Sequence, residues 1–378
     1  SWIIDGTLAN IAWAPSLVSY NLSWEKIRTW NTGVDFGLFN NRLTGSFDYY
    51  IRKTDDMVGP SEKLPVVLGT AVPSSNNTNL KTFGWELELM WKDRLNNGLN
   101  YSARFTLADS RTKITRYSNP SGLIDGFYAG KYVGEIWGYE TIGIAQSDQE
   151  MAEHIGRLVN GGQSNLGQDW KAGDIMYKDS NEDGKIDAGS RTLQDHGDLK
   201  RIGNSTPRYN VGLELAADWK GFDIRMFWQG TLKRDYFQGS YYFWGANGRQ
   251  GPWFSTALKG HDDYFRNDEA SPLGTNLNSY YPRPLFNTDK NQQSQTKYLQ
   301  DASYLRLKNL QIGYSLPHNI VQKMGMQHLR IFASGENLFT ITSLIDFFDP
   351  ESIEGGSWGH GNVYPLSRTF SFGLNVTF

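Results

Sequence analysis

Apolar and polar residues alternate with a period of two at the end of the chain. In the terminal segment RTFSFGLNVTF, one parity holds Phe370, Phe372, Leu374, Val376 and Phe378, whereas small or polar residues fill the other. Because successive side chains of a β-strand point to opposite faces, this pattern predicts a strand with one apolar and one polar face. That strand ends on an aromatic residue.

The same alternation recurs along the chain and predicts about nine strands. The clearest internal example is TFGWELELMWK, in which Phe83, Trp85, Leu87 and Leu89 share one parity. The segments with this pattern are 29–39, 42–52, 82–92, 99–107, 209–219, 222–230, 303–315, 327–340 and 368–378. The sequence therefore predicts an all-β protein.

The connections between these strands are alternately short and long. The short ones are 40–41, 93–98, 220–221 and 317–326, and the long ones are about 55–79, 112–206, 236–298 and 341–365. In an outer-membrane barrel, short turns face the periplasm and long loops face the outside. The alternation predicts a transmembrane antiparallel β-barrel with long extracellular loops, located in the bacterial outer membrane with its C-terminus in the periplasm.

The composition agrees with a barrel better than with a soluble protein. Aromatic residues make up 14% of the chain, yet no run approaches the roughly 18–20 apolar residues of a membrane helix. A soluble antiparallel sandwich is the alternative, but aromatic residues at strand ends and such long connections disfavour it. The net charge of -3 gives no reason to expect nucleic acid as a partner.

Nine strands cannot be the whole barrel, because bacterial barrels of one chain have even strand numbers and closure requires an N-terminal partner for the last strand. Two open sheet edges in lipid would leave backbone groups without hydrogen bonds. We therefore expect the chain to be the C-terminal part of a longer barrel protein.

Several segments share a detailed pattern beyond the alternation. They are residues 30–57, 83–92, 173–192 (GDIMYKDSNEDGKIDAGSRT), 201–230, 304–317 (YLRLKNLQIGYSLP) and 329–342 (LRIFASGENLFTIT). In this order they resemble the SusC/RagA family of TonB-dependent outer-membrane transporters of Bacteroidetes. The resemblance covers nearly the whole chain.

The resemblance implies a barrel of about 22 strands with an N-terminal plug, which this chain lacks, and a SusD-like lipoprotein that caps it. It implies energy-dependent import, with TonB acting through the missing N-terminal part. Members of the family import oligosaccharides or, in some cases, peptides. The aromatic-rich loops favour an oligosaccharide. The alternatives are a peptide importer and a barrel for adhesion or structure that imports nothing.

The segment DSNEDGKID has the ligand spacing of an EF-hand calcium loop, without clearly helical flanks. Gly184 would make the sharp turn, but Ser190 stands where a bidentate carboxylate normally completes the ligand shell. The alternative is an acidic turn held by Asx hydrogen bonds alone. The candidate calcium ligands are Asp179, Asn181, Asp183, Lys185 through its backbone carbonyl, and Asp187.

Aromatic side chains in the long loops are the candidate substrate contacts, because sugar rings pack their C–H faces on aromatic planes. The alternative is that these rings only fold the loops or meet a lid protein. The candidates are Trp137, Tyr139, Tyr241, Tyr242, Trp244, Trp253 and Trp358.

The sequence does not predict an enzyme or an organic cofactor. The 6 histidines show no metal-ligand spacing such as H-E-x-x-H. Glu86 and Glu88 share the inferred inner face of a strand. In a wet channel, two carboxylates are more simply solvating groups than a glycosidase pair.

Overall fold

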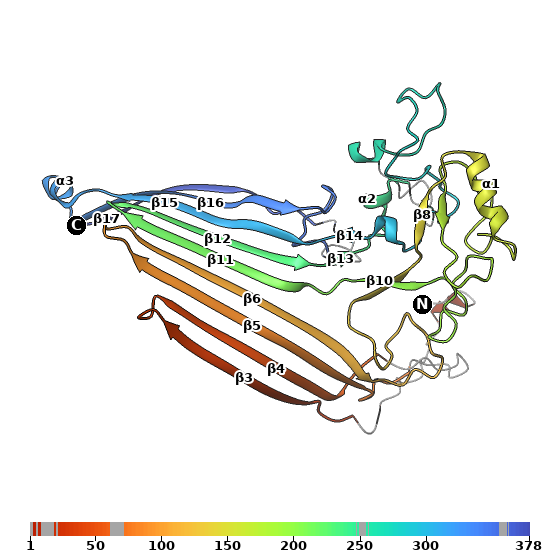
Figure 1. The fold of residues 1–378 in the computed structure, drawn as a ribbon, viewed down its shortest axis with the longest axis horizontal. Coiled ribbons are helices and arrows are strands. Elements are labelled where there is room, and N and C mark those ends of the chain that lie inside the picture. Colours follow the sequence, from red (N-terminus) through yellow and green to blue (C-terminus); the bar gives the residue numbers. More distant parts are fainter. Residues whose placement is uncertain are drawn as a thin grey trace.

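The fold is dominated by a 9-stranded antiparallel sheet (Figure 1). The computed structural model describes residues 3–4, 7–8, 19, 22–60, 72–246, 248, 255, 257–354, 361 and 363–378. The long strands are β3 (Lys26–Leu38), β4 (Leu43–Met57), β5 (Thr78–Arg94), β6 (Asn100–Arg116), β11 (Arg208–Trp219), β12 (Phe222–Lys233), β15 (Tyr304–Ser315), β16 (His328–Thr342) and β17 (Thr369–Thr377).

The long strands pair in the order in which they follow one another along the chain. Each neighbouring pair is antiparallel. Strands β3 and β17 form the two edges of this sheet within the described part of the chain. The predicted all-β barrel architecture is confirmed as one continuous section of a barrel wall.

The remaining elements are short, and most lie in the connections. Paired short strands are β1 (Ile3–Ile4) with β2 (Thr7–Leu8), β7 (Glu135–Gly138) with β10 (Lys200–Asn204), β8 (Thr141–Ile144) with β9 (Ile175–Tyr177), and β13 (Asp235–Tyr236) with β14 (Gln300–Asp301). The helices are α1 (Asp148–Arg157), α2 (Tyr241–Trp244) and α3 (His318–Lys323), with 3-10 turns at Lys259–Asp262 and Thr296–Tyr298. Among the described residues, no helix has the length and apolar character to span a membrane.

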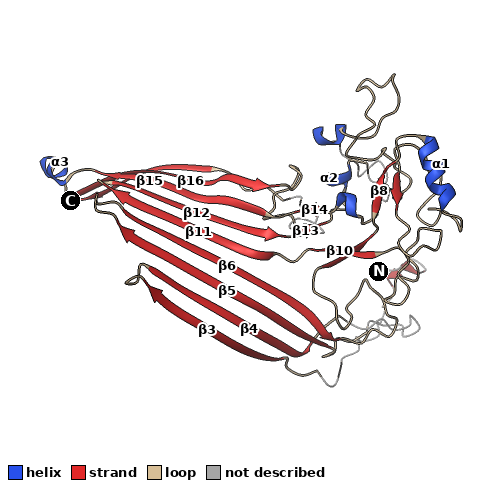
Figure 2. Ribbon diagram, in the orientation of Figure 1, coloured by secondary structure: helices blue, strands red, loops and turns tan. Residues whose placement is uncertain are grey.

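The two ends of the sheet differ in their connections. The short turns, α3 and the C-terminus lie at one end, whereas α1, α2 and the small sheets lie at the other (Figures 1 and 2). The β11–β12 turn is tight because Lys220 and Gly221 both have positive φ, at 50° and 90°. Positive φ at both central residues is the geometry of a type I′ hairpin, which suits the twist of paired strands.

The apolar face of the sheet is exposed on the protein. Phe370, Phe372 and Leu374 keep 68%, 85% and 67% of their surface accessible. Neighbouring strands pack aromatic rings on this face, such as Phe47 of β4 and Trp85 of β5, whose ring centroids lie 6.4 Å apart. A soluble sandwich would cover such a face with a second layer. The exposed apolar face of β17 agrees with the predicted lipid-facing surface, whereas in β15 the apolar parity changes from Leu305 and Leu307 to Leu310 and Ile312 where the register shifts.

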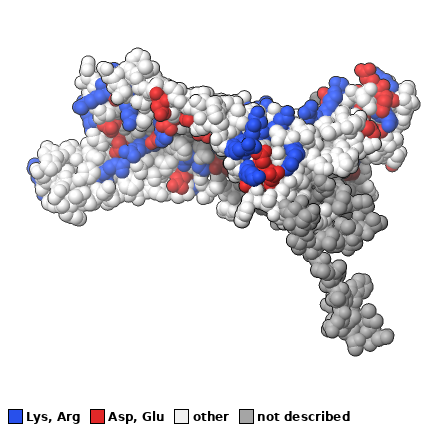
Figure 3. Space-filling view, turned by 90° about the horizontal axis from the view of Figure 1, so that it is seen from below, with Lys and Arg blue, Asp and Glu red and all other residues white. Residues whose placement is uncertain are grey.

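The opposite face carries charged and polar groups in mixed clusters. Arg104 donates to both carboxylate oxygens of Glu88, at 3.0 and 2.8 Å, across β5 and β6. Farther along the sheet, Arg330 donates to Asp223 at 2.9 and 2.5 Å. Figure 3 shows acidic and basic side chains beside one another rather than in patches of one sign. This face is typical of the wet interior of a barrel.

The two faces of β17 should respond differently to the same new charge. We expect Phe372→Arg to destabilise the complete barrel by about 2–4 kcal/mol, because a cation near the middle of the lipid face loses its hydration. The adjacent Ser371→Arg lies on the inner face and should have little effect. The heat-modifiable mobility of folded protein from outer membranes measures both. Equal loss of folded protein in the two variants would contradict the assignment of faces.

Candidate functional site

The two longest connections, 117–207 and 234–303, share an aromatic core that lies beyond the sheet. Trp244 and Tyr298 pack edge to face with ring centroids 4.7 Å apart, and Tyr281 stacks on Tyr298 at 6.2 Å. Tyr139 and Tyr177 join the same buried cluster. Since such rings bury large apolar areas, this cluster gives the loops a core of their own.

A buried ionic group joins the two connections. Asp174 is fully buried and accepts hydrogen bonds from Arg283 at 2.7 and 2.8 Å and from Asn291 at 2.9 Å. The ammonium of Lys290, 1% exposed, lies 2.9 Å from the same carboxylate. Burial alone would raise the pKa of Asp174, but the hydrogen bonds from Arg283, Asn291 and Lys290 outweigh it and lower the pKa. Asp174 is therefore a charged anchor between the loops.

A cavity of about 350 Å³ opens beside this core, and we call it the Trp137 cavity. Trp137 lies on β7 and Tyr139 directly follows that strand, and both line the cavity with Phe237. The described residues that line it are Ile124, Asp125, Lys131, Glu135, Trp137, Tyr139, Arg191, Leu199, Phe237, Gly239, Gln292, Gln293 and Ser294. Aromatic and polar groups thus occupy one concave surface.

The charged groups of the Trp137 cavity balance one another. Arg191 forms a two-point ion pair with Asp125 at 2.9 and 2.8 Å. Lys131 donates to two backbone carbonyl groups at 3.1 and 2.8 Å, and burial lowers its pKa. Glu135 accepts from a tyrosine hydroxyl at 2.6 Å. With two acidic and two basic side chains in its lining, the cavity suits a polar molecule without net charge.

Some polar atoms of the cavity lining are buried in the protein. The hydroxyl of Ser294 is buried without a hydrogen bond within the described part of the chain, and the indole of Trp137 interacts with the hydroxyl of Tyr128. Burial raises the pKa of Tyr139 to about 12, so its hydroxyl remains a neutral donor or acceptor. The polar groups that can meet a ligand are therefore the accessible side chains of the lining, such as Asp125 and Arg191.

The structure places the predicted substrate residues in different environments. Trp137 and Tyr139 share the Trp137 cavity, whereas Trp244 lines a second cavity and is 5% exposed. Tyr241 and Tyr242 lie on α2 with ring centroids 4.4 Å apart. The other two candidates, Trp253 and Trp358, lie outside the described residues.

Sequence reasoning missed the polar half of the Trp137 cavity. Asp125, Arg191 and Ser294 are far apart along the chain and belong to no recognisable motif. Arg191 does lie inside the segment 173–192, but nothing in that pattern indicates its pairing with Asp125. Only the packing of one long connection on the other brings these residues together.

The predicted calcium loop is held by hydrogen bonds within the loop. Asp179 accepts from the backbone N–H groups of Asp183 at 3.2 Å and Gly184 at 2.8 Å. The ammonium of Lys185 reaches Asp187 at 2.6 Å. No three acidic or histidine side chains converge as a metal site in the described ranges. The Asx hydrogen bonds of the alternative are present, and calcium binding stays a prediction.

The chain matches a known family along most of its length. The family described as "TonB dependent receptor-like, beta-barrel" aligns with residues 6–338. The chain belongs to this family. Barrels of the family reside in the outer membrane.

Curated relatives carry the same family name. TonB-dependent receptor P3 of Formosa agariphila is 29% identical over 380 residues, which cover 95% of this chain and 34% of that protein. TonB-dependent receptor SusC of Bacteroides thetaiotaomicron is 26% identical, covering 96% of this chain and 33% of that protein. The chain thus spans about a third of the length of these relatives.

Solved structures support the fold. The structure of the RagAB peptide transporter aligns with a TM-score of 0.68 and 23% identity, covering 98% of this chain and 38% of that chain. The RagAB peptide importer in the open-open state aligns with a TM-score of 0.66 and 22% identity, covering 98% of this chain and 37% of that chain. At this identity the likeness shows a common architecture.

The ionic anchor gives a prediction for loop stability. We expect Asp174→Asn to lower the free energy of opening of residues 117–207 and 234–303 by about 3–5 kcal/mol, because Lys290 keeps a buried charge without its carboxylate. Asp125→Asn is the matched control, since it breaks an exposed ion pair and should cost no more than about 1 kcal/mol. Amide hydrogen exchange of the two segments measures both. Similar exchange in both variants would show that Asp174 is not the anchor.

The calcium prediction can be tested on the complete protein after treatment with a chelator. Added calcium should protect residues 117–207 from protease at concentrations of roughly 10⁻⁴–10⁻³ M, the range of extracellular calcium modules. Asp179→Ala should abolish this protection, whereas Glu153→Ala on α1 should leave it intact. Protection that is absent, or unchanged in Asp179→Ala, would favour the turn held only by Asx hydrogen bonds.

Proposed function

We propose that the chain forms part of a TonB-dependent outer-membrane importer of the SusC type that takes up oligosaccharides. The observation that carries this proposal is the Trp137 cavity, located in the long connections at one end of the barrel wall. Binding sites for small molecules combine apolar and aromatic walls with a few placed polar groups. The Trp137 cavity has both.

The chemistry of this cavity suits a sugar ring in particular. The apolar faces of a sugar can pack on Trp137 and Tyr139, while its hydroxyls donate and accept hydrogen bonds. The lining side chains Asp125, Arg191 and Gln293 supply acceptors and donors of that kind. The balanced charges around them require no charge on the ligand.

Peptide import is the second candidate, because the structures that align with this chain include the RagAB peptide transporter. That likeness supports the fold only. A peptide would present few hydroxyl groups to the polar lining, so the cavity favours the oligosaccharide.

The proposed importer works with partners. By resemblance to the SusC/RagA family, a SusD-like lipoprotein would cover the long loops, and TonB would supply energy through an N-terminal part that precedes this region. The relative named SusC supports this assignment. The barrel wall and loops described above would then form part of the transport path and of the capture surface.

Variants of the Trp137 cavity test the proposal in the complete transporter. We expect Trp137→Ala to weaken binding of the recognised neutral oligosaccharide about tenfold or more, because the ring loses its packing with the sugar. Tyr139→Phe should weaken it about twofold to tenfold, as for one lost hydrogen bond. Tyr132→Phe, outside the cavity lining, is the matched control.

Calorimetric titration against a panel of neutral oligosaccharides and peptides, followed by uptake into cells, provides the measurements. Binding of peptides alone would overturn the oligosaccharide assignment. Surface binding without uptake in cells that contain TonB would indicate the adhesion alternative.

A further inference from the structure

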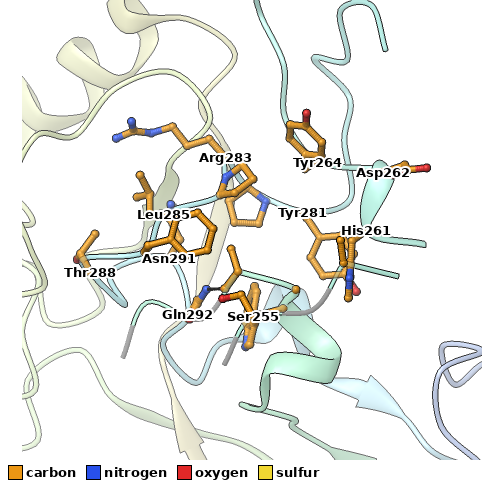
Figure 4. Close-up of a pocket in the computed structure, with 17 residues that line it drawn as sticks. Ser255, His261, Asp262, Tyr264, Tyr281, Arg283, Leu285, Thr288, Asn291 and Gln292 are labelled. Carbon is orange, nitrogen blue, oxygen red and sulfur yellow. Dashed lines mark hydrogen bonds between the residues drawn. The ribbon is translucent and has the colours of Figure 1, made fainter. Parts of the chain in front are cut away.

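A second cavity, which we call the α2 cavity, lies beside α2 and encloses about 410 Å³ (Figure 4). Gln292 lines both this cavity and the Trp137 cavity. Its amide donates to the carbonyl of Ala246 at 2.5 Å and accepts from the N–H of Gly248 at 3.1 Å. Two hydrogen bonds thus fix the side chain that the two cavities share.

The polar side chains in the wall of the α2 cavity are largely committed to the protein. His261 accepts from the N–H of Leu258 at 2.9 Å and approaches two backbone carbonyl groups of α2 at 3.0 and 3.1 Å. Arg283 and Asn291 both bind the buried Asp174. These groups therefore have little capacity left for the many hydroxyls of a sugar.

Leu285, Phe286 and two prolines form the apolar part of the wall, beside the hydroxyl side chains of Ser255 and Thr288. Asp262 is exposed at the cavity, and the guanidinium of Arg283, the cation that lines it, is already engaged by the carboxylate of Asp174. An anionic ligand would be repelled by the carboxylate of Asp262, and Arg283 would not be available to pair with it. The charges favour an uncharged ligand.

Two polar atoms in this lining lack partners. The indole Nε1 of Trp244 and the hydroxyl of Tyr281 are buried without a hydrogen bond to any described residue. Their residues are 5% and 4% exposed. Each atom has less than 1 Å² of accessible surface, so a ligand in the cavity contacts the apolar parts of these two rings and not their polar atoms.

The volume sets the size of the ligand. An apolar cavity of about 150 Å³ in another protein binds benzene. At about 410 Å³ the α2 cavity has room for an aromatic ring together with a polar substituent.

We propose that the α2 cavity is a second binding site, which takes an uncharged aromatic group. Gln292 also lines the Trp137 cavity, where we place the sugar. The recognised molecule is therefore a glycan whose aromatic substituent binds in the α2 cavity. The identification of the ligand as a glycan rests on the proposed function, whereas the assignment of the α2 cavity as a binding site does not.

Benzamide and benzoate, which match in size and differ in charge, are the probes for the complete transporter in nanodiscs. Ligand-observed NMR titration should show that benzamide binds and that benzoate binds at least tenfold more weakly. Leu285→Trp, which fills the α2 cavity, should abolish benzamide binding. Leu273→Trp is the matched control, because Leu273 is 54% exposed and lies outside the lining.

Tyr281→Phe is a second control. It removes a hydroxyl that has no partner, so the melting temperature should stay the same or rise. Benzamide binding should stay unchanged as well, because the cavity does not reach that hydroxyl. Unchanged benzamide binding in Leu285→Trp, or no binding to the wild type, would overturn the proposal. Benzoate binding as tight as benzamide would overturn the uncharged ligand class.

Oligosaccharide titrations on the same samples distinguish this inference from the proposed function. If sugar binding that depends on Trp137 is present but benzamide does not bind, the proposal of a second binding site is wrong and the oligosaccharide assignment stands. If benzamide binds and no sugar does, the α2 cavity is a binding site and the molecule that bears the aromatic group is not a glycan.

Discussion

The interior of a membrane offers no water to backbone N–H and C=O groups, so each must find its hydrogen bond within the protein. The long strands meet this constraint through the continuous pairing of one antiparallel sheet. The same constraint keeps irregular backbone away from lipid and sends it to the two ends of the strands. Sites that need irregular backbone must therefore form in the connections.

Those connections require a separate source of stability, because the sheet offers its apolar face to lipid. Residues 117–207 and 234–303 obtain it from rings packed around Tyr298 and from the buried Asp174. A buried carboxylate is stable only when its partners are in place. Arg283, Lys290 and Asn291 come from the second connection, so folding of one loop requires the other.

The same anchor shapes both cavities. Asn291 binds Asp174, and the next residue, Gln292, lines the Trp137 cavity and the α2 cavity. The Trp137 cavity has balanced charges in a polar lining, whereas the α2 cavity has more apolar walls and committed polar groups. A short segment held by a buried ion thus contributes to two surfaces of different chemistry. This arrangement suits a ligand with a polar part and an apolar part.

The sequence by itself determined the strands, their faces and the alternation of short and long connections. A two-residue period is enforced at every position by the two environments of a barrel wall, so it can be read locally. The tertiary structure decided which loop residues form a site. It placed Trp244 in the core, Trp137 at a cavity, and Asp125 and Arg191 beside it. Contacts such as that of Asp174 with Asn291, 117 positions apart, depend on how one loop packs on another, and no local pattern encodes that packing.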